Sequence, residues 1–260
     1  MLFEEIKKFK EKLTNEAVYG PFSKTSDPGI IEAAGYGGFD FIILDLEHGP
    51  NNVQTLQNLI RAAQNSNILP IVRVKENCDS LIGEVLDVGA AGIQVPQISN
   101  AEDASRIIRL AKFAPQGMRG VCRFVRAANY SSMDRYEYFK KSNDALIIMH
   151  LEGQESINNL DEIMDVSGID VLFIGPYDLS QSLGVPGQID HPIVEEKMKQ
   201  IIQKCKEKGI YVGTFVDTLE NAKKWENAGV KYISYSVDIG IFYEQCKNIM
   251  QNLKGDSHEN

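Results

Sequence analysis

Eight short apolar runs, rich in β-branched and aromatic residues, recur along the chain, and most are followed by a segment with helical spacing. Runs that are apolar on both faces are typical of strands buried in a parallel sheet, which amphipathic helices would then cover. The runs are EAVYGPF (residues 16–22), FDFIILD (39–45), LPIVRV (69–74), AGIQVP (91–96), ALIIMHLE (145–152), DVLFIG (170–175), IYVGTFV (210–216) and VKYISYS (230–236).

Three of the helical segments are clearly marked in the sequence. Apolar residues repeat at helical spacing within residues 53–63, 104–111 and 194–205. Ser99 and Glu102 have the spacing of a capping box at the start of the second helix. The third helix is expected to start around residues 190–192 and to stop at Gly209, the usual order of start and stop signals.

Eight such units in a chain of 260 residues favour a TIM barrel over an open doubly wound sheet. An open sheet usually carries a glycine-rich dinucleotide turn after its first strand, whereas GYGGFD here precedes a strand. Since 43% of the residues are hydrophobic, the chain can fill a core of that size. We therefore expect an α/β fold, a TIM (β/α)8 barrel, formed by residues 1–254 as one domain.

Three segments do not belong to a minimal barrel. The first dozen residues predict an extra helix that closes the barrel floor. Residues 113–144 form a long insertion between the fourth and fifth strands, and long insertions in compact domains are usually functional or interfacial. The polar tail, residues 255–260, is expected to be disordered.

Charge and cysteine content narrow the class of protein. A net charge of -9 disfavours nucleic acid or an anionic membrane as a general partner, although local arginines can still bind an anionic substrate. No apolar run reaches the roughly 20 residues of a membrane helix, and the charged N-terminus does not resemble a secretory signal. The four cysteines form no CxxC pair, so we expect reduced, mostly buried thiols in a cytoplasmic protein.

Charged side chains gather where several of the predicted strands end. Catalytic groups of TIM barrels lie at the carboxyl ends of the strands, so these side chains should converge on one rim. They are Asp45, Glu47 and His48 after the second strand, Arg73 in the third, Glu152 at the end of the fifth and Asp178 after the sixth.

Glu152 and Asp178 are candidate metal ligands. Two facing carboxylates without a cation between them would repel and raise each other's pKa. A hard divalent ion such as Mg²⁺ or Mn²⁺ removes that repulsion and keeps positions open for water and substrate. Taken singly, Glu152 could be an acid at a helix N-terminus and Asp178 an N-cap, but the two together favour metal.

His48 and Arg73 are candidates for the chemistry itself. A histidine among acids is suited to proton transfer near neutral pH, although it could be an ordinary loop residue. Arg73 inside an apolar run has to be paired, and at the rim its guanidinium would bind a carboxylate or an enolate. His150 points to the same side of its strand as Glu152, either into the site or into a layer of the barrel.

The motifs around these residues resemble those of the HpcH/HpaI family of metal-dependent pyruvate aldolases. The likeness covers most of the chain, with the motifs in family order and at family-like spacing. It runs through SKTSDPGIIEAAGYGGFDFIILDLEHGPNN, PIVRVKE, VLDVGAAGIQVPQISNAEDA, PQGMRGV, RAANY, HLEGQESINNLDEI and FIGPYDLSQSLGVPGQ.

The resemblance implies a role for each candidate. Glu152 and Asp178 match the ligands of a divalent metal, Mg²⁺ or Mn²⁺, with Co²⁺ as a further candidate. His48 matches the catalytic base, and Arg73 matches the arginine that binds the pyruvate carboxylate and the enolate oxygen. The remaining matches are Asp87, in VLDVG, to an acid that pairs with the histidine, Asp45 and Glu47 to the acidic surround, and Gly175, Pro176 and the amides up to Asp178 to the segment that grips the pyruvate carboxylate.

The same resemblance implies a homohexamer, a trimer of dimers, that exchanges its last helix, here within IGIFYEQCKNIM. Two positions depart from the family pattern. The family usually has glutamine where this chain has His150 and alanine where it has Tyr177. Both residues are expected to face the pocket and to contact substrate, so they bear on the choice of substrate and leave the metal and the base intact.

The implied activity is reversible cleavage of a 4-hydroxy-2-oxo acid into pyruvate, or a close 2-oxo acid, and an aldehyde. Three other interpretations stay open. A Schiff-base aldolase would use Lys75, which is otherwise an exposed loop lysine. An enzyme of the citrate-lyase-like branch would cleave a CoA thioester, and a barrel without catalytic activity would bind an oxo acid or only assemble.

Overall fold

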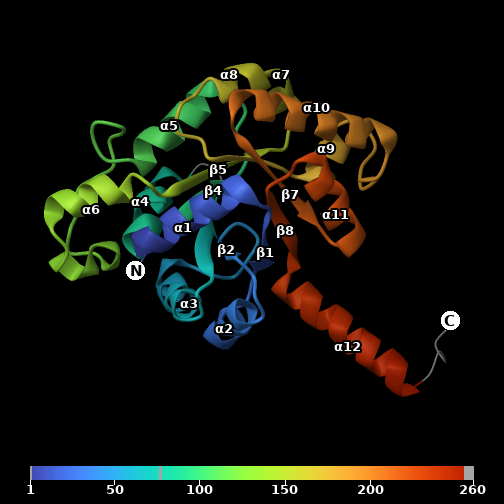
Figure 1. The fold of residues 1–260 in the computed structure, drawn as a ribbon, viewed down its shortest axis with the longest axis horizontal. Coiled ribbons are helices and arrows are strands. Elements are labelled where there is room, and N and C mark those ends of the chain that lie inside the picture. Colours follow the sequence, from blue (N-terminus) through green and yellow to red (C-terminus); the bar gives the residue numbers. More distant parts are fainter. Residues whose placement is uncertain (1, 76–77, 255–260) are drawn as a thin grey trace.

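In the computed structural model, which describes residues 2–75 and 78–254, eight parallel strands close into a barrel (Figure 1). Each strand pairs with the next one along the chain, and β8 pairs with β1, which confirms the predicted TIM barrel. The strands are β1 (Val18–Ser23), β2 (Phe41–Asp45), β3 (Leu69–Arg73), β4 (Gly92–Val95), β5 (Leu146–Leu151), β6 (Val171–Ile174), β7 (Tyr211–Val216) and β8 (Tyr232–Val237).

Helices follow the strands and cover the outside of the barrel (Figure 1). The three apolar stripes expected from the sequence are buried in α3, α5 and α10. No helix in the described part of the chain combines the length and apolarity that crossing a membrane requires. The helices are α1 (Leu2–Asn15), α2 (Pro28–Tyr36), α3 (Val53–Asn65), α4 (Asp79–Asp87), α5 (Ala101–Ala111), the 3-10 helix η1 (Arg126–Ser131), α6 (Arg135–Ser142), α7 (Gln154–Asn158), α8 (Leu160–Met164), α9 (Pro176–Ser182), α10 (Pro192–Lys208), α11 (Leu219–Ala228) and α12 (Asp238–Lys254).

Two helix ends show which local signals the chain uses. α10 begins at Pro192 and stops at Gly209, whose left-handed backbone (φ 72°) ends the helix as predicted. The predicted capping box at Ser99 is one residue too early. Asn100 caps α5 instead, and its side chain accepts a hydrogen bond from the Asp103 N–H at 2.9 Å. The Asn100 side chain therefore caps the helix in place of Ser99.

The first helix closes the amino-terminal end of the barrel, as predicted. α1 buries Ile6, Phe9 and Leu13, which pack with the first residues of the strands, among them Phe41 and Leu69. The Phe9 and Phe41 rings meet edge to face with their centroids 5.9 Å apart. In TIM barrels the catalytic groups lie at the other end, at the carboxyl ends of the strands.

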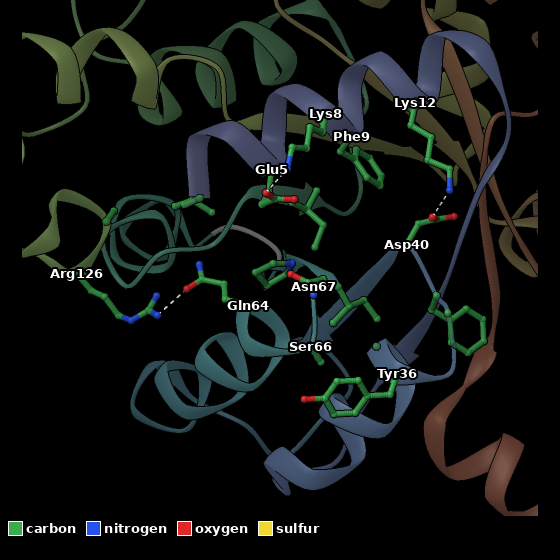
Figure 2. Close-up of a pocket in the computed structure, with 18 of the residues that line it drawn as sticks. Glu5, Lys8, Phe9, Lys12, Tyr36, Asp40, Gln64, Ser66, Asn67 and Arg126 are labelled. Atoms are coloured by element: carbon green, nitrogen blue, oxygen red, sulfur yellow. Dashed lines mark hydrogen bonds and ion pairs between the residues drawn. The ribbon is translucent and has the colours of Figure 1, made fainter.

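A cavity of about 980 Å³ lies at this covered end, between α1 and the starts of β2 and β3 (Figure 2). Charged side chains on its border are already paired within the chain. Lys12 donates to Asp40 at 2.5 Å, and Arg126 of η1 donates to Gln64 at 2.6 Å. The cavity lies at the opposite end of the barrel from Arg73, Glu152 and Asp178.

Two parts of the chain stand outside the barrel wall. The insertion folds into η1 and α6, and it has a small apolar cluster of its own: Phe113, Ala127, Ala128 and Tyr138. α12 extends away from the barrel after β8 (Figure 1), and none of its 17 residues, all described, is buried. Its large apolar side chains are exposed: Ile239, Phe242, Tyr243, Ile249, Met250 and Leu253.

The cysteines are less buried than the sequence predicted. All four are free thiols, but Cys205 is the one that is buried, and Cys78 is partly buried. Cys122 and Cys246 are exposed because they lie in the insertion and on α12, the two parts that stand outside the barrel wall. The polar tail, residues 255–260, lies outside the described residues.

Gly20 in β1 allows the barrel to close. A Cβ at this position would overlap the Phe41 carbonyl oxygen and ring on the neighbouring strand. We expect Gly20→Ala to lower the free energy of unfolding by roughly 2–4 kcal/mol, the cost of overpacking a core that cannot move aside. Chemical denaturation followed by circular dichroism measures the change.

Gly83 in α4 supplies the matched control for this substitution. A Cβ at Gly83 meets nothing within 4 Å, so Gly83→Ala should raise the free energy of unfolding by about 0.5–1 kcal/mol through helix propensity. Equal effects of the two substitutions would contradict the packing argument.

Candidate active site

The charged residues expected at one rim do meet at the carboxyl ends of β2, β3, β5 and β6. Asp45 and Arg73 are the last residues of β2 and β3 and are register partners across the pair. Glu152 follows β5, and Gly175 follows β6 on the neighbouring strand. The barrel geometry therefore brings side chains more than 100 positions apart in the sequence to one place.

Arg73 is held by two acids from β2 and the loop after it. Its Nε donates to Asp45 Oδ1 at 2.8 Å and its Nη2 to Asp45 Oδ2 at 2.6 Å, while Nη1 lies 3.1 Å from Glu47 Oε2. The guanidinium also lies over the Phe22 ring, 4.6 Å from its centroid. Three of its N–H groups are thus engaged in fixing its position, and the others can bind an anion in the site.

Asp45 is completely buried, yet it stays ionised. Burial alone would raise its pKa, but the hydrogen bonds and the charge of Arg73 outweigh burial and lower the pKa below its usual range. The backbone N–H groups of Glu47 and His48 add to this effect, at 3.0 and 3.3 Å from Asp45 Oδ1. The same carboxylate therefore shapes the loop that carries the predicted base.

His48 stands at the open side of this cluster. Its side chain is 65% exposed, and its Nε2 lies 3.8 Å from Glu47 Oε2. Burial raises the pKa of Glu47, and the charge of Glu152 raises it further against the opposing effect of Arg73. An exposed imidazole beside a half-buried carboxylate can take up or release a proton with solvent or substrate.

Glu152 is oriented by His150, the residue two places earlier on β5. His150 Nδ1 lies 2.5 Å from Glu152 Oε1, and the Gln97 N–H donates to Glu152 Oε2 at 3.1 Å. Burial would raise the pKa of Glu152, but the hydrogen bond from His150, together with the Gln97 N–H and the charge of Arg73, lowers it on balance. The other nitrogen of His150 lies 2.6 Å from Gln94 Nε2, so both ring nitrogens are engaged inside the protein.

Asp178, in the first turn of α9, shares a small space with Glu152. A Cβ added at Gly175 would lie 2.8 Å from Asp178 Oδ2 and 3.7 Å from Glu152 Cγ, so the missing side chain of this glycine leaves room between the two acids. Burial raises the pKa of Asp178, and the negative charge of Glu152 raises it further. The two carboxylates therefore repel each other.

The residues at this point fit a hard divalent cation. They offer two carboxylates with oxygen donors, a gap that a Cβ at Gly175 would fill, and a mutual repulsion that a cation would relieve. Within residues 2–75 and 78–254, no group of three or more His, Cys, Asp or Glu side chains is arranged around one metal position. Two protein ligands leave most of the coordination shell to water and substrate.

Three residues singled out from the sequence lie away from Glu152 and Asp178 or at the edge of the site. Asp87 is the last residue of α4, at the amino-terminal end of the barrel, and binds Arg119 at 2.5 Å. The predicted pairing of Asp87 with His48 therefore does not occur within one chain, because α4 runs the length of the barrel between the two ends. Lys75 is exposed after β3, and Tyr177 at the rim donates to Asp217 at 2.8 Å.

Sequence reasoning missed the residues that support the site from inside the barrel. Gln94 in β4 and Tyr232 in β8 are fully buried, and Tyr232 Oη lies 3.2 Å from Gln94 Oε1. The signal for Gln94 was available, because an amide in the middle of AGIQVP has to be hydrogen-bonded when buried. Nothing in the local sequence joins it to His150 or to Tyr232.

Comparisons with known proteins show the family to which the chain belongs. The family model for HpcH/HpaI aldolase/citrate lyase matches residues 19–244. The 5-keto-4-deoxy-D-glucarate aldolase of Salmonella paratyphi C is 31% identical over 249 residues, which cover 95% of this chain and 96% of the relative. The chain belongs to the HpcH/HpaI aldolase/citrate lyase family and is a carbon–carbon lyase.

Two solved structures match over nearly the whole chain. An HpcH/HpaI aldolase/citrate lyase family protein from Burkholderia cenocepacia J2315 has a TM-score of 0.89 and 30% identity, over 95% of this chain and 99% of that one. The citrate synthase SbnG has a TM-score of 0.84 and 32% identity, over 95% of this chain and 98% of that one. These two structures are similarly identical to this chain, and one is named for cleaving and the other for forming a carbon–carbon bond.

The raised pKa of Asp178 predicts how the metal-free protein responds to pH. A carboxyl group whose pKa is higher in the folded state favours folding only while it is protonated, and this contribution is lost as pH rises through the folded-state pKa. In EDTA, Asp178→Asn should therefore melt at a higher temperature than the unsubstituted protein at pH 7–8. The gain should vanish below about pH 4, where the acid is protonated in both folded and unfolded states. Thermal melts across this pH range test it.

Asp45→Asn is the matched control, with the opposite sign. The pKa of Asp45 is lowered on folding, so its carboxylate stabilises the protein above the unfolded-state pKa and this contribution is lost as pH falls through the folded-state pKa. The substitution leaves Arg73 without its buried partner, at a cost of about 3–5 kcal/mol. If Asp178→Asn also lowered the melting temperature at pH 7–8, the repulsion between Glu152 and Asp178 would be refuted.

Proposed function

We propose that this protein catalyses reversible, divalent-metal-dependent aldol cleavage of a 4-hydroxy-2-oxo acid to pyruvate, or a close 2-oxo acid, and an aldehyde. One observation carries the proposal: Glu152 and Asp178 border one small space at the carboxyl end of the barrel, in the same site as Arg73. This set offers a cation site and a guanidinium to a substrate that carries a carboxylate and a keto oxygen.

Glu152 and Asp178 would hold the metal, Mg²⁺ or Mn²⁺ with Co²⁺ as a further candidate. When bound, it supplies positive charge that draws electrons from the keto oxygen. Arg73 binds the same end of the substrate through the N–H groups that Asp45 and Glu47 leave unused, and it stabilises the negative charge that develops on the enolate oxygen. Asp45 keeps that guanidinium in place.

The first turn of α9 would bind the carboxylate of the oxo acid. The N–H groups that open a helix have no partner inside the helix, so the Tyr177 N–H can donate to an anion, whereas Pro176 has no N–H and the Asp178 N–H bonds to its own carboxylate. The hydroxyl and ring of Tyr177 lie beside Asp217 at the rim, where they would contact the aldehyde part of the substrate.

His48 would move the proton. It takes the proton of the C4 hydroxyl while the C3–C4 bond breaks, so that the hydroxyl carbon becomes the aldehyde and the bond electrons pass into the enolate. It then delivers a proton to C3, which yields the 2-oxo acid. Its exposure and the nearby carboxylate of Glu47 suit this exchange. Asp87 has no part in this step within one chain, because it binds Arg119 at the other end of the barrel.

The activity is measured by pyruvate release from 5-keto-4-deoxy-D-glucarate, the substrate in the Salmonella relative's name, and by condensation of pyruvate with a set of aldehydes. We expect turnover with Mn²⁺ or Mg²⁺ and none in EDTA. Arg73→Ala should lower kcat about 10²- to 10³-fold, because it removes charge stabilisation in the transition state. Glu152→Ala and Asp178→Ala should abolish Mn²⁺ binding, while Glu220→Ala on the exposed start of α11 should leave both binding and turnover unchanged.

Two other results would point elsewhere. Turnover that resists EDTA and is trapped by borohydride would indicate a Schiff base at Lys75. Condensation of acetyl-CoA with oxaloacetate, without aldol cleavage, would place the chain with the structure named citrate synthase, which it resembles at 32% identity. Normal turnover by Glu152→Ala or Asp178→Ala would contradict the proposed metal site.

We also propose that the protein assembles as a homohexamer, a trimer of dimers, in which α12 packs on a second copy. The exposed apolar side chains of α12 support this, because a stripe of that size is rarely left in water. Light scattering after gel filtration should show the assembly, and Phe242→Asp should dissociate it. Gln245→Asp, which adds the same charge to the same helix, is the control, and a monomeric unsubstituted protein would contradict the proposal.

A further inference from the structure

A line of three buried polar side chains crosses the barrel interior to Glu152. Tyr232 on β8, Gln94 on β4 and His150 on β5 are 0%, 0% and 2% exposed. Tyr232 Oη lies 3.2 Å from Gln94 Oε1, Gln94 Nε2 lies 2.6 Å from His150 Nε2, and His150 Nδ1 lies 2.5 Å from Glu152 Oε1. Buried polar groups cost free energy unless they are hydrogen-bonded, and each member of this line bonds to the next.

The donors and acceptors along this line can point in one consistent direction. The buried Tyr232 hydroxyl needs an acceptor, and Gln94 Oε1 is the oxygen beside it. The amide of Gln94 then presents its NH₂ group to His150, and an NH₂ group only donates. His150 Nε2 must therefore accept, which leaves the ring proton on Nδ1, where it is donated to Glu152.

Aromatic packing holds this line in place. The Tyr232 ring stacks on Phe41 with centroids 4.0 Å apart, and the His150 ring stacks on Phe173 with centroids 4.7 Å apart. Phe173 and Tyr232 also meet edge to face at 6.2 Å. Neither terminal ring can turn without disturbing the centre of the barrel, so the hydrogen-bond direction is built into the core.

We infer that Gln94 and Tyr232 are positioning residues for Glu152, which act by fixing the proton of His150 on Nδ1. This inference rests on the proposed role of Glu152 as a metal ligand. His150 Nδ1–H holds Oε1 and the Gln97 amide holds Oε2, so the orientation of the carboxylate is set before any cation arrives. Because both of its nitrogens are engaged, His150 orients a ligand and does not bind substrate.

The proton position is measured in the metal-free protein by ¹⁵N NMR of the histidine ring. The unsubstituted protein should show one form, with a protonated Nδ1 and a bare Nε2 at His150. Tyr232→Phe removes one hydroxyl and lets the Gln94 amide turn over, so both proton positions should be populated. Tyr138→Phe, an equally buried tyrosine in the insertion, is the control and should leave the His150 signals unchanged.

The effect of the Glu152 orientation on metal binding is measured as the affinity for Mn²⁺, by calorimetry without substrate. Loss of an outer partner of a metal ligand costs about 10- to 100-fold in affinity, and we expect this range for His150→Phe. Tyr232→Phe and Gln94→Met should weaken binding by about 10-fold or less, because they loosen the orientation of Glu152 without removing its partner. His150→Asn, which keeps an N–H donor near the Nδ1 position, should recover part of the loss.

The outcomes separate this inference from the proposed function. If the unsubstituted protein fails to bind Mn²⁺, the metal-dependent function is wrong, and the positioning role falls with it even where the ring proton is found on Nδ1. If it binds Mn²⁺ but Tyr232→Phe and Gln94→Met change neither the ring signals nor the affinity, the positioning role alone is overturned. A change in the ring signals with unaltered affinity also overturns it.

Discussion

The buried carboxylate of Asp45 governs the arrangement of the catalytic rim. Burial at 0% exposure would raise its pKa, but two hydrogen bonds from Arg73 and the charge of the guanidinium lower it below its usual range. Asp45 in return fixes the guanidinium and, through the N–H groups of Glu47 and His48, the loop after β2. One ion pair between neighbouring strand ends thus positions both the Arg73 guanidinium and the loop that carries His48.

On the other side of the rim, two carboxylates repel each other, whereas Asp45 and Arg73 attract each other. The negative charge of Glu152 raises the pKa of Asp178, so the two carboxylates repel each other. Because Gly175 has no side chain, it leaves room beside them. In the proposed function a cation would relieve this repulsion, and its binding would then also contribute to the stability of the fold. The Glu152 carboxylate is held by His150 and by the Gln97 N–H, so its orientation is fixed by hydrogen bonds inside the protein.

The sequence predicts the barrel well because its signals are repetitive and local. Eight apolar runs set the strands, three apolar stripes set helices that are found buried, and signals around Pro192 and Gly209 mark the two ends of α10. The cap of α5 was misplaced by one residue, since Ser99 and Asn100 are both good caps and the choice between them depends on side-chain geometry. Asp87, Gln94 and Tyr232 could not be placed from the sequence, because their partners lie on other elements and depend on how the barrel closes.

The last helix obeys a different thermodynamic rule from the rest of the chain. The barrel core is formed by contacts within one molecule, so its stability does not depend on how much protein is present. α12 buries none of its residues in its own chain, and in the proposed hexamer its apolar side would be covered by a second copy. In the proposed assembly, the share of the folding free energy that comes from α12 would follow mass action: it would fall on dilution and leave the helix more open to proteolysis.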